Sequence, residues 1–302
     1  MSMWQKTFAQ SLYDHLEALE CLLGPEPHVA VITTGIESKD CIPCSEEEQF
    51  SCINDTGESG ALQDRLGHYE GGKVDPDYVY VTSPHCPSTL DSTNLDCLYD
   101  AETETGILLT GNTGCGYERG MEAMKMALEN QTGFLRKDAI LLVVVLSNEE
   151  DCGSIQDIEE GVSGVGGKAC YYASKGTDPE GHQVDGLAPV KDYYDFLISL
   201  KDGKKGMVKF LAFVGMQDPN DPASTKIEYE STSNGEWKIT PVCQMPGCAD
   251  NCDDDDQNCL ESCTAYPGTR YIELARMFGD YGFADKITLM ASIANTRLAL
   301  HR

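Results

Sequence analysis

The sequence has little positive charge and no long hydrophobic run. Its 22 lysines and arginines stand against 50 aspartates and glutamates, which gives a formal net charge of −28 at pH 7. Such a charge repels nucleic acid and anionic membrane surfaces, and no stretch approaches the roughly 20 apolar residues of a transmembrane helix. The sequence therefore predicts no nucleic-acid partner and no membrane span. Divalent cations and basic proteins are the partners that the charge favours.

Two common hydrolase signatures are also missing. The six histidines, at positions 15, 28, 68, 85, 182 and 301, form no H-E-x-x-H pair, and no G-x-S-x-G occurs. Carboxylates are abundant along the whole chain, so their proximity in sequence identifies no acid–base pair. We therefore expect a protein that is not an enzyme, with a secreted hydrolase as the less favoured alternative.

Cysteine, by contrast, is plentiful. The fourteen cysteines are spread through loop-like segments rich in Gly, Pro and Asp. This usage predicts several disulfides and an exported protein, located in the periplasm, on the cell surface or outside the cell. Residues 1–23 lack the basic start and apolar core of a signal peptide. Export then implies a leader that has been removed or a start other than the native one.

The most hydrophobic run lies at residues 140–146 and is followed directly by polar and acidic residues. Its sequence, ILLVVVL, is rich in valine, which is typical of a central parallel strand buried on both faces. Ligands of open parallel sheets lie beyond the carboxyl ends of the strands, where Ser147, Asn148 and the acids at 149–151 follow. These residues form a candidate site, although a solvated turn after a core strand explains each acid equally well.

Helices and strands alternate around this run. Apolar spacing predicts helices at 2–23, 117–128, 189–200, 270–278 and 291–300, and strands at 28–34, 207–214 and 286–290. This alternation is typical of an α/β fold, a mostly parallel sheet with helices on both faces. We expect one domain over residues 1–302. A loop-rich, cysteine-containing excursion at 35–110 should include an edge strand at 78–82.

Residues 217–268 interrupt the alternation and form an insertion. Asn234-Gly235 predicts a tight hairpin between strands at 226–233 and 236–242.

Four cysteines with the spacing C-x3-C-x6-C-x3-C follow the hairpin. The spacing fits two short helices joined by nested bridges, Cys248 with Cys263 and Cys252 with Cys259. A four-thiolate zinc site is the alternative.

Several segments together resemble the cysteine-containing von Willebrand factor A-type (vWA) domains of bacterial exported proteins. They are HVAVITTG at 28–35, NLDCLY at 94–99, TGNTGCGYERGMEAM at 110–124, LLVVVLSNEEDCG at 141–153, the helix around 193–197 and TRYIELARMFGD at 269–280. GCGYE followed by VVLSNEEDC is the most specific pair. The resemblance implies a doubly wound sheet with a metal-ion-dependent adhesion site at its top.

The family's metal site uses Asp-x-Ser-x-Ser after the first strand, a Thr in the second loop and an Asp after the fourth strand. The resemblance places Thr113 and Asn148 at the last two positions, with Glu149 and Asp151 beside Asn148. Asn keeps a carbonyl ligand and lacks the charge, which should weaken binding of Mg²⁺ or Mn²⁺. The Asp-x-Ser-x-Ser segment is missing. Ser2 is either its last ligand or the N-cap of the first helix.

The resemblance also implies a first strand that pairs with the strands at 28–34 and 140–146. Without it both would have an unpaired edge, so we expect a sequence that begins after its natural first strand, or a strand supplied in trans by a partner. The same arrangement brings Cys115 and Cys152 onto adjacent loops, which predicts a bridge between them.

We therefore expect an exported adhesion or surface-assembly module that binds a protein partner. A carboxylate of the partner would complete the shell of a degenerate Mg²⁺, Mn²⁺ or Ca²⁺ site. The alternative is a metal-free structural component of a larger surface assembly, organised by disulfides.

Overall fold

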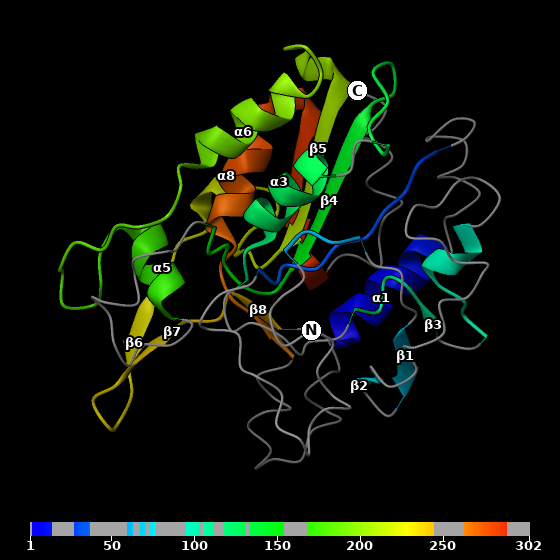
Figure 1. Ribbon diagram of the computed structural model, residues 1–302. Helices are drawn as coiled ribbons and strands as arrows, with labels where there is room; N and C mark the ends of the chain where they lie inside the picture. Colours follow the sequence, from blue (N-terminus) through cyan, green and yellow to red (C-terminus); the bar gives the residue numbers. More distant parts are fainter. Residues whose placement is uncertain are drawn as a thin grey trace. The chain divides into compact units, whose positions relative to one another are not determined.

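The computed structural model describes residues 2–13, 27–36, 59–62, 67–70, 73–75, 95–102, 105–110, 118–130, 133–153, 168–244 and 263–288 (Figure 1). The chain divides into two compact units. The first contains Met1–Cys115, Ala123–Arg136 and Leu289–Arg302, and the second contains Gly116–Glu122 and Lys137–Thr288. The single domain expected over residues 1–302 stays a prediction.

A three-stranded parallel sheet forms the core of the second unit. Its order is β10 (Gly282–Lys286), β5 (Val208–Val214) and β4 (Leu141–Ser147). Val143 lies opposite Phe210, and Ala284 opposite Ala212, with all strands parallel. The structure thus confirms a mixed α/β fold and the strands predicted at 140–146 and 207–214. The last strand begins four residues earlier than the predicted 286–290.

The central strand of the described sheet is β5, and β4 is its last described strand, so the position of 140–146 in the middle of the sheet stays a prediction. Six of the seven residues of β5 are buried, whereas only Leu141 and Ser147 are buried in β4. Both strands are apolar on both faces. The pattern of apolar residues therefore could not show which strand is central, because the position of a strand in a sheet depends on which other segments pair with it.

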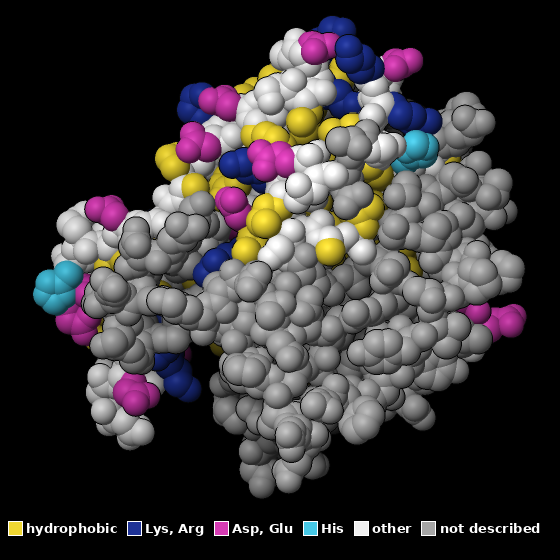
Figure 2. Space-filling model, viewed as in Figure 1, with side chains coloured by type: hydrophobic (Ala, Val, Ile, Leu, Met, Phe, Trp, Pro, Cys, Tyr) yellow, Lys and Arg dark blue, Asp and Glu magenta, His cyan; other side chains and the backbone are white. Residues whose placement is uncertain are grey.

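Two helices lie on one side of this sheet. Helix α8 (Thr269–Phe278) packs against β5 and β10, and α6 (Val190–Ser199) packs against α8. Phe278 stacks on Phe210 with ring centroids 6.0 Å apart. The helices predicted at 189–200 and 270–278 are thus confirmed. Figure 2 shows acidic and basic side chains mixed over the face that carries α6. Helices on the opposite face, and hence a doubly wound order, stay a prediction.

The rest of the second unit consists of shorter elements. Helix α5 (Lys168–Lys175) was not predicted. The hairpin of β6 (Tyr229–Ser231) and β7 (Trp237–Ile239) confirms the Asn-Gly prediction, with Gly235 at φ +80° and shorter strands than expected. Strand β8 (Cys243–Gln244) pairs with β9 (Thr264–Ala265). The 3-10 turns are Lys205–Met207, Pro222–Ser224 and Gly279–Tyr281.

The cysteine-rich part of the insertion is described only at its end. Cys263 is fully buried and disulfide-bonded. Cys248, Cys252 and Cys259 lie outside the described residues, so the nested bridges and the alternative zinc site stay predictions.

The first unit contains helix α1 (Ser2–Tyr13), which buries Trp4, Phe8 and Ala9. The helix predicted at 2–23 is confirmed as far as Tyr13, and residues 14–23 lie outside the described part. An antiparallel sheet has the order β2 (Lys73–Asp75), β1 (Gly67–Glu70) and β3 (Thr105–Gly106), and a 3-10 turn spans Leu95–Leu98. Sequence reasoning missed this sheet. The edge strand at 78–82 and the closing helix at 291–300 lie outside the described residues.

The strand predicted at 28–34 is wrong. Residues 27–36 form an irregular segment in which only Val29 makes a bridge. Val29 and Val31 instead pack beside the buried cluster of Cys97, Leu98 and Ile107. Alternating β-branched residues predicted a strand. Here these side chains pack against the cluster, although the segment forms no regular strand.

Helix α3 (Gly120–Asn130) confirms the helix predicted near 117–128. Its first residues, through Glu122, belong to the second unit.

Candidate functional site at the carboxyl end of the sheet

The segment before α8 lies across the carboxyl ends of β4 and β5. The Tyr266 backbone N–H donates to the Asn148 carbonyl at 2.8 Å, and the Gly268 N–H donates to the Gly215 carbonyl at 3.0 Å. A Cβ on Gly215 would lie 1.9 Å from the Tyr266 carbonyl oxygen, so only glycine permits this approach. The acidic loop after β4 is thereby brought against the start of α8.

Glu150 accepts hydrogen bonds from the first turn of α8. The Thr269 N–H donates to Oε2 at 2.9 Å, the Arg270 N–H donates to Oε1 at 3.0 Å, and the Thr269 and Ser174 hydroxyls also donate to Oε2. The unpaired N–H groups and the positive dipole end of a helix favour a carboxylate there. Burial raises the pKa of Glu150, and the bonds from Thr269 and Arg270 oppose that rise. Glu150 therefore attaches β4 to α8.

Asp151 attaches the same loop to the start of α3. Oδ1 accepts from the Met121 N–H at 2.9 Å, and Oδ2 accepts from the Gly153 N–H at 3.0 Å and from Arg270 Nε at 3.2 Å. The side chain is fully buried. Burial raises the pKa of Asp151, and the Arg270 charge opposes that rise. Both oxygens are thus engaged in holding the loop, the helix and the guanidinium together.

Asn148 and Glu149 differ from these two acids in their surroundings. Asn148 is 8% exposed, and its side-chain nitrogen lies 3.5 Å from the Thr264 carbonyl. The Glu149 main chain exchanges hydrogen bonds with the Ser147 hydroxyl, at 3.0 and 3.2 Å. Burial raises the pKa of the Glu149 carboxyl. Glu149 is the acid of this loop that caps no described helix.

A second carboxyl group, Glu118, lies near Glu149. Burial, and after it the negative charge of Glu149, raises the pKa of Glu118 to about 8. The Glu118 carbonyl accepts from the Cys152 N–H at 2.7 Å, which holds this residue beside the loop. Two neighbouring carboxyls that repel each other retain a proton or bind a cation.

Tyrosine side chains border the same loop. The Tyr171 hydroxyl accepts a hydrogen bond from the Glu150 N–H at 3.2 Å, and the Tyr193 hydroxyl donates to Glu122 at 2.7 Å. A Cβ on Gly153 would lie 2.4 Å from the Tyr193 hydroxyl oxygen. Burial raises the pKa of both tyrosines. They act as neutral hydrogen-bonding groups.

The loop ends in a disulfide that differs from the predicted one. Cys152 is bonded to Cys170 of α5, with Cα atoms 5.2 Å apart, so the predicted bridge between Cys115 and Cys152 is wrong. The helix at Lys168–Lys175 was not predicted from the sequence. Without α5, Cys170 could not be placed next to the loop.

Asn148, Glu149 and Asp151 lie on the loop that directly follows β4, and their role as metal ligands stays a prediction. Thr113 lies outside the described residues. Ser2 is the first residue of α1 in the first unit, and its proposed role as ligand or cap stays a prediction. Sequence reasoning missed Glu118, Thr269 and Arg270. Gly268 followed by Thr269 at the start of an amphipathic helix was the available signal for a helix N-terminus at this site.

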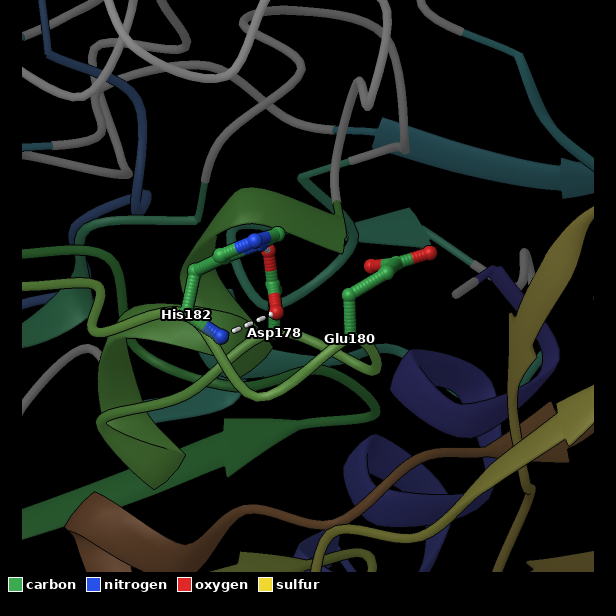
Figure 3. Close-up of side chains that lie close together, drawn as sticks. All are labelled: Asp178, Glu180 and His182. Atoms are coloured by element: carbon green, nitrogen blue, oxygen red, sulfur yellow. Dashed lines mark hydrogen bonds and ion pairs between the residues drawn. The ribbon is translucent and has the colours of Figure 1, made fainter.

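A separate group of side chains with metal-binding atoms lies on the loop after α5. The ligand atoms of Asp178, Glu180 and His182 lie within 4.8 Å of one another (Figure 3). His182 Nδ1 is 2.7 Å from Asp178 Oδ2, and the indole N–H of Trp237 donates to Glu180 at 2.8 Å. The hydrogen bond to Asp178 raises the pKa of His182. Glu180 and His182 are exposed, and exposed acidic groups are common without an ion.

No family model, no curated protein and no solved structure matches this chain. Within the described part of the chain, no helix has the length and hydrophobicity needed to cross a membrane.

Proposed function

We propose that this chain is an exported protein-binding module of the vWA type that recognises its partner at the carboxyl end of the β10-β5-β4 sheet. The observation that carries the proposal is the loop 148–151, which places Glu149 next to Glu118 where parallel strands commonly bind ligands. The resemblance of the sequence to vWA domains and its many cysteines support the same function. The net charge of −28 favours a basic partner or a bound cation.

The residues at this site differ in how well they suit a divalent cation. Asp151 already accepts three hydrogen bonds, one of them from Arg270, whose positive charge opposes a nearby cation. Glu149 and Glu118 fit better, because a cation would relieve the repulsion between their charges. Asn148 would add a neutral oxygen. We therefore propose Glu149, Glu118 and Asn148 as the residues that would hold Mg²⁺, Mn²⁺ or Ca²⁺, with a partner carboxylate as a further ligand.

Calorimetric titration with MnCl₂, MgCl₂ and CaCl₂ in turn tests the cation. We expect a dissociation constant on the order of 10⁻⁴ to 10⁻³ M, as for extracellular calcium modules. Glu149→Gln should weaken binding at least about tenfold, since it removes a charged ligand. Glu129→Gln, an exposed acid on α3, is the matched control and should leave binding unchanged. If none of the three ions binds, the proposed cation site is rejected.

A metal-free structural component is the second candidate. The favouring observation is that Glu150, Asp151 and Arg270, together with the Cys152–Cys170 bridge, already hold the loop by protein groups alone. In this case EDTA leaves the thermal unfolding midpoint unchanged, and neighbouring proteins purify with the chain in constant proportion in the presence of EDTA. Loss of those neighbours on adding EDTA would favour the cation-dependent module.

A further inference from the structure

The tip of the β6–β7 hairpin carries the one Asn-Gly pair of the sequence, Asn234 and Gly235. Both residues are exposed. Apart from the chain neighbours of Gly235, no described atom lies within 4 Å of the position that a Cβ on this residue would take. Asparagine is among the thermolabile residues of proteins. The tip therefore exposes an asparagine to water, next to a backbone nitrogen that no side chain of its own residue shields.

We propose that Asn234 is a site of spontaneous deamidation, with water as the co-reactant. The Gly235 backbone nitrogen loses its proton and attacks Cγ of the Asn234 side chain. A bond from this nitrogen to Cγ forms, the bond from Cγ to Nδ2 breaks, and Nδ2 leaves with the proton as ammonia. Water then opens the cyclic imide at either of its carbonyls, which gives aspartate or iso-aspartate. The net change is hydrolysis of one amide, and nothing is oxidised or reduced.

One hydrogen bond holds the attacking nitrogen in the folded hairpin. The Gly235 N–H donates to the Thr232 carbonyl at 3.0 Å, and this bond must open before the nitrogen can lose its proton. Local opening requires little free energy where few buried contacts hold a segment. Residues 233–236 are all exposed. The reaction therefore proceeds from the folded chain after opening of the tip alone.

Deamidation loosens the hairpin. The Thr232 N–H donates to the Glu236 carbonyl at 2.7 Å, and the Glu236 N–H donates to the Thr232 hydroxyl at 3.1 Å, so these bonds close the loop. Iso-aspartate adds a backbone atom inside this closed loop, and both products place a new carboxylate near the exposed Glu236. The next pair along the hairpin is Ser231 opposite Trp237, whose indole N–H donates to Glu180. Loosening of the tip should therefore expose Trp237.

Tryptic mapping of the whole chain, before and after storage in mildly alkaline buffer, tests the modification. Cleavage after lysine yields two cysteine-free peptides, 227–238 with Asn234 and 210–226 with Asn220. Asn220 is the internal control, because it is exposed but donates from its side-chain amide to Asp218 at 3.2 Å and precedes an aspartate. We expect the deamidated form of 227–238 to increase with time while 210–226 stays unchanged. An unmodified Asn234, or equal rates for both asparagines, would overturn the proposal.

The substitution Asn234→Gln separates the chemistry from the fold. The φ of Asn234 is not positive, so glutamine can adopt the same backbone, and its longer side chain forms a cyclic imide far more slowly. The chain has two tryptophans, and Trp4 is fully buried, so quenching of the fluorescence by acrylamide reports mainly on Trp237. Storage should increase quenching in the unsubstituted chain and leave it unchanged in the variant. Equal quenching in the two stored chains would overturn the proposed loosening.

Discussion

The Arg270 guanidinium lies 3.2 Å from Asp151 Oδ2, and both side chains are buried. The same guanidinium donates from its NH2 nitrogen to the Ala188 carbonyl at 2.8 Å. Arg270 belongs to the first turn of α8, whereas Asp151 follows β4 and caps α3. The pair therefore joins segments far apart in sequence at the carboxyl end of the sheet.

Removal of the Arg270 guanidinium should strongly destabilise the protein. Arg270→Gln leaves Asp151 buried without its counter-charge, and breaking a buried pair in this way costs about 3–5 kcal/mol. Urea unfolding followed by circular dichroism measures the loss. Arg276→Gln, an exposed arginine of the same helix, is the control and should change stability by about 0.5 kcal/mol or less. Equal effects of the two substitutions would show that the pair contributes nothing specific.

Glu150 should matter for the first turn of α8 more than for the rest of the helix. Glu150→Ala leaves the Thr269 and Arg270 N–H groups without their acceptor, at a cost of about 1–3 kcal/mol. Glu150→Gln keeps one acceptor oxygen and should cost less. Hydrogen exchange should accelerate in the first turn of α8 in the alanine variant. Glu273→Ala, exposed on the same helix, should leave those rates unchanged.

Stability should fall as pH rises toward 8. Burial raises the pKa of Glu118 from 4.5 in the unfolded chain to about 8 in the folded chain, so the folded chain retains a proton that the unfolded chain releases. The contribution of Glu118 to folding is therefore complete below pH 4.5 and is lost as pH rises through 8. Unfolding midpoints between pH 5 and 9 should decline less steeply in Glu118→Gln. Glu129→Gln should keep the original slope, and a matching slope in Glu118→Gln would contradict the proposed burial.

Short-range sequence patterns predicted the strands, helices and turns whose formation depends mainly on neighbouring residues. The apolar runs at 140–146 and 207–214 became β4 and β5, and the spacing of Tyr193 and Leu197 gave α6. Asn234-Gly235 gave the hairpin, because the backbone requirement of a tight turn lies within two residues. The acidic loop was also located correctly after β4.

Long-range choices could not be predicted in the same way. The segment 28–34 has strand composition, yet Val29 and Val31 pack against Leu98 and Ile107, which are distant in sequence. The partner of Cys152 depended on α5, which sequence reasoning did not find. The functions of Glu150 and Asp151 depended on where α8 and α3 begin in space. From sequence alone, a solvated turn explains each of these acids as well as a binding site does.

The Cys152–Cys170 bridge should be the main covalent support of the acidic loop. Its sequence separation of 18 residues corresponds to a stabilisation of about 3 kcal/mol in the chain-entropy description. The double substitution of both cysteines by alanine should lower the free energy of unfolding by about this amount. Cys243→Ala removes a partly buried free thiol and is the control, with a smaller expected loss. Peptide mapping without reductant should recover Cys152 linked to Cys170, and recovery of Cys152 linked to Cys115 would contradict the structure.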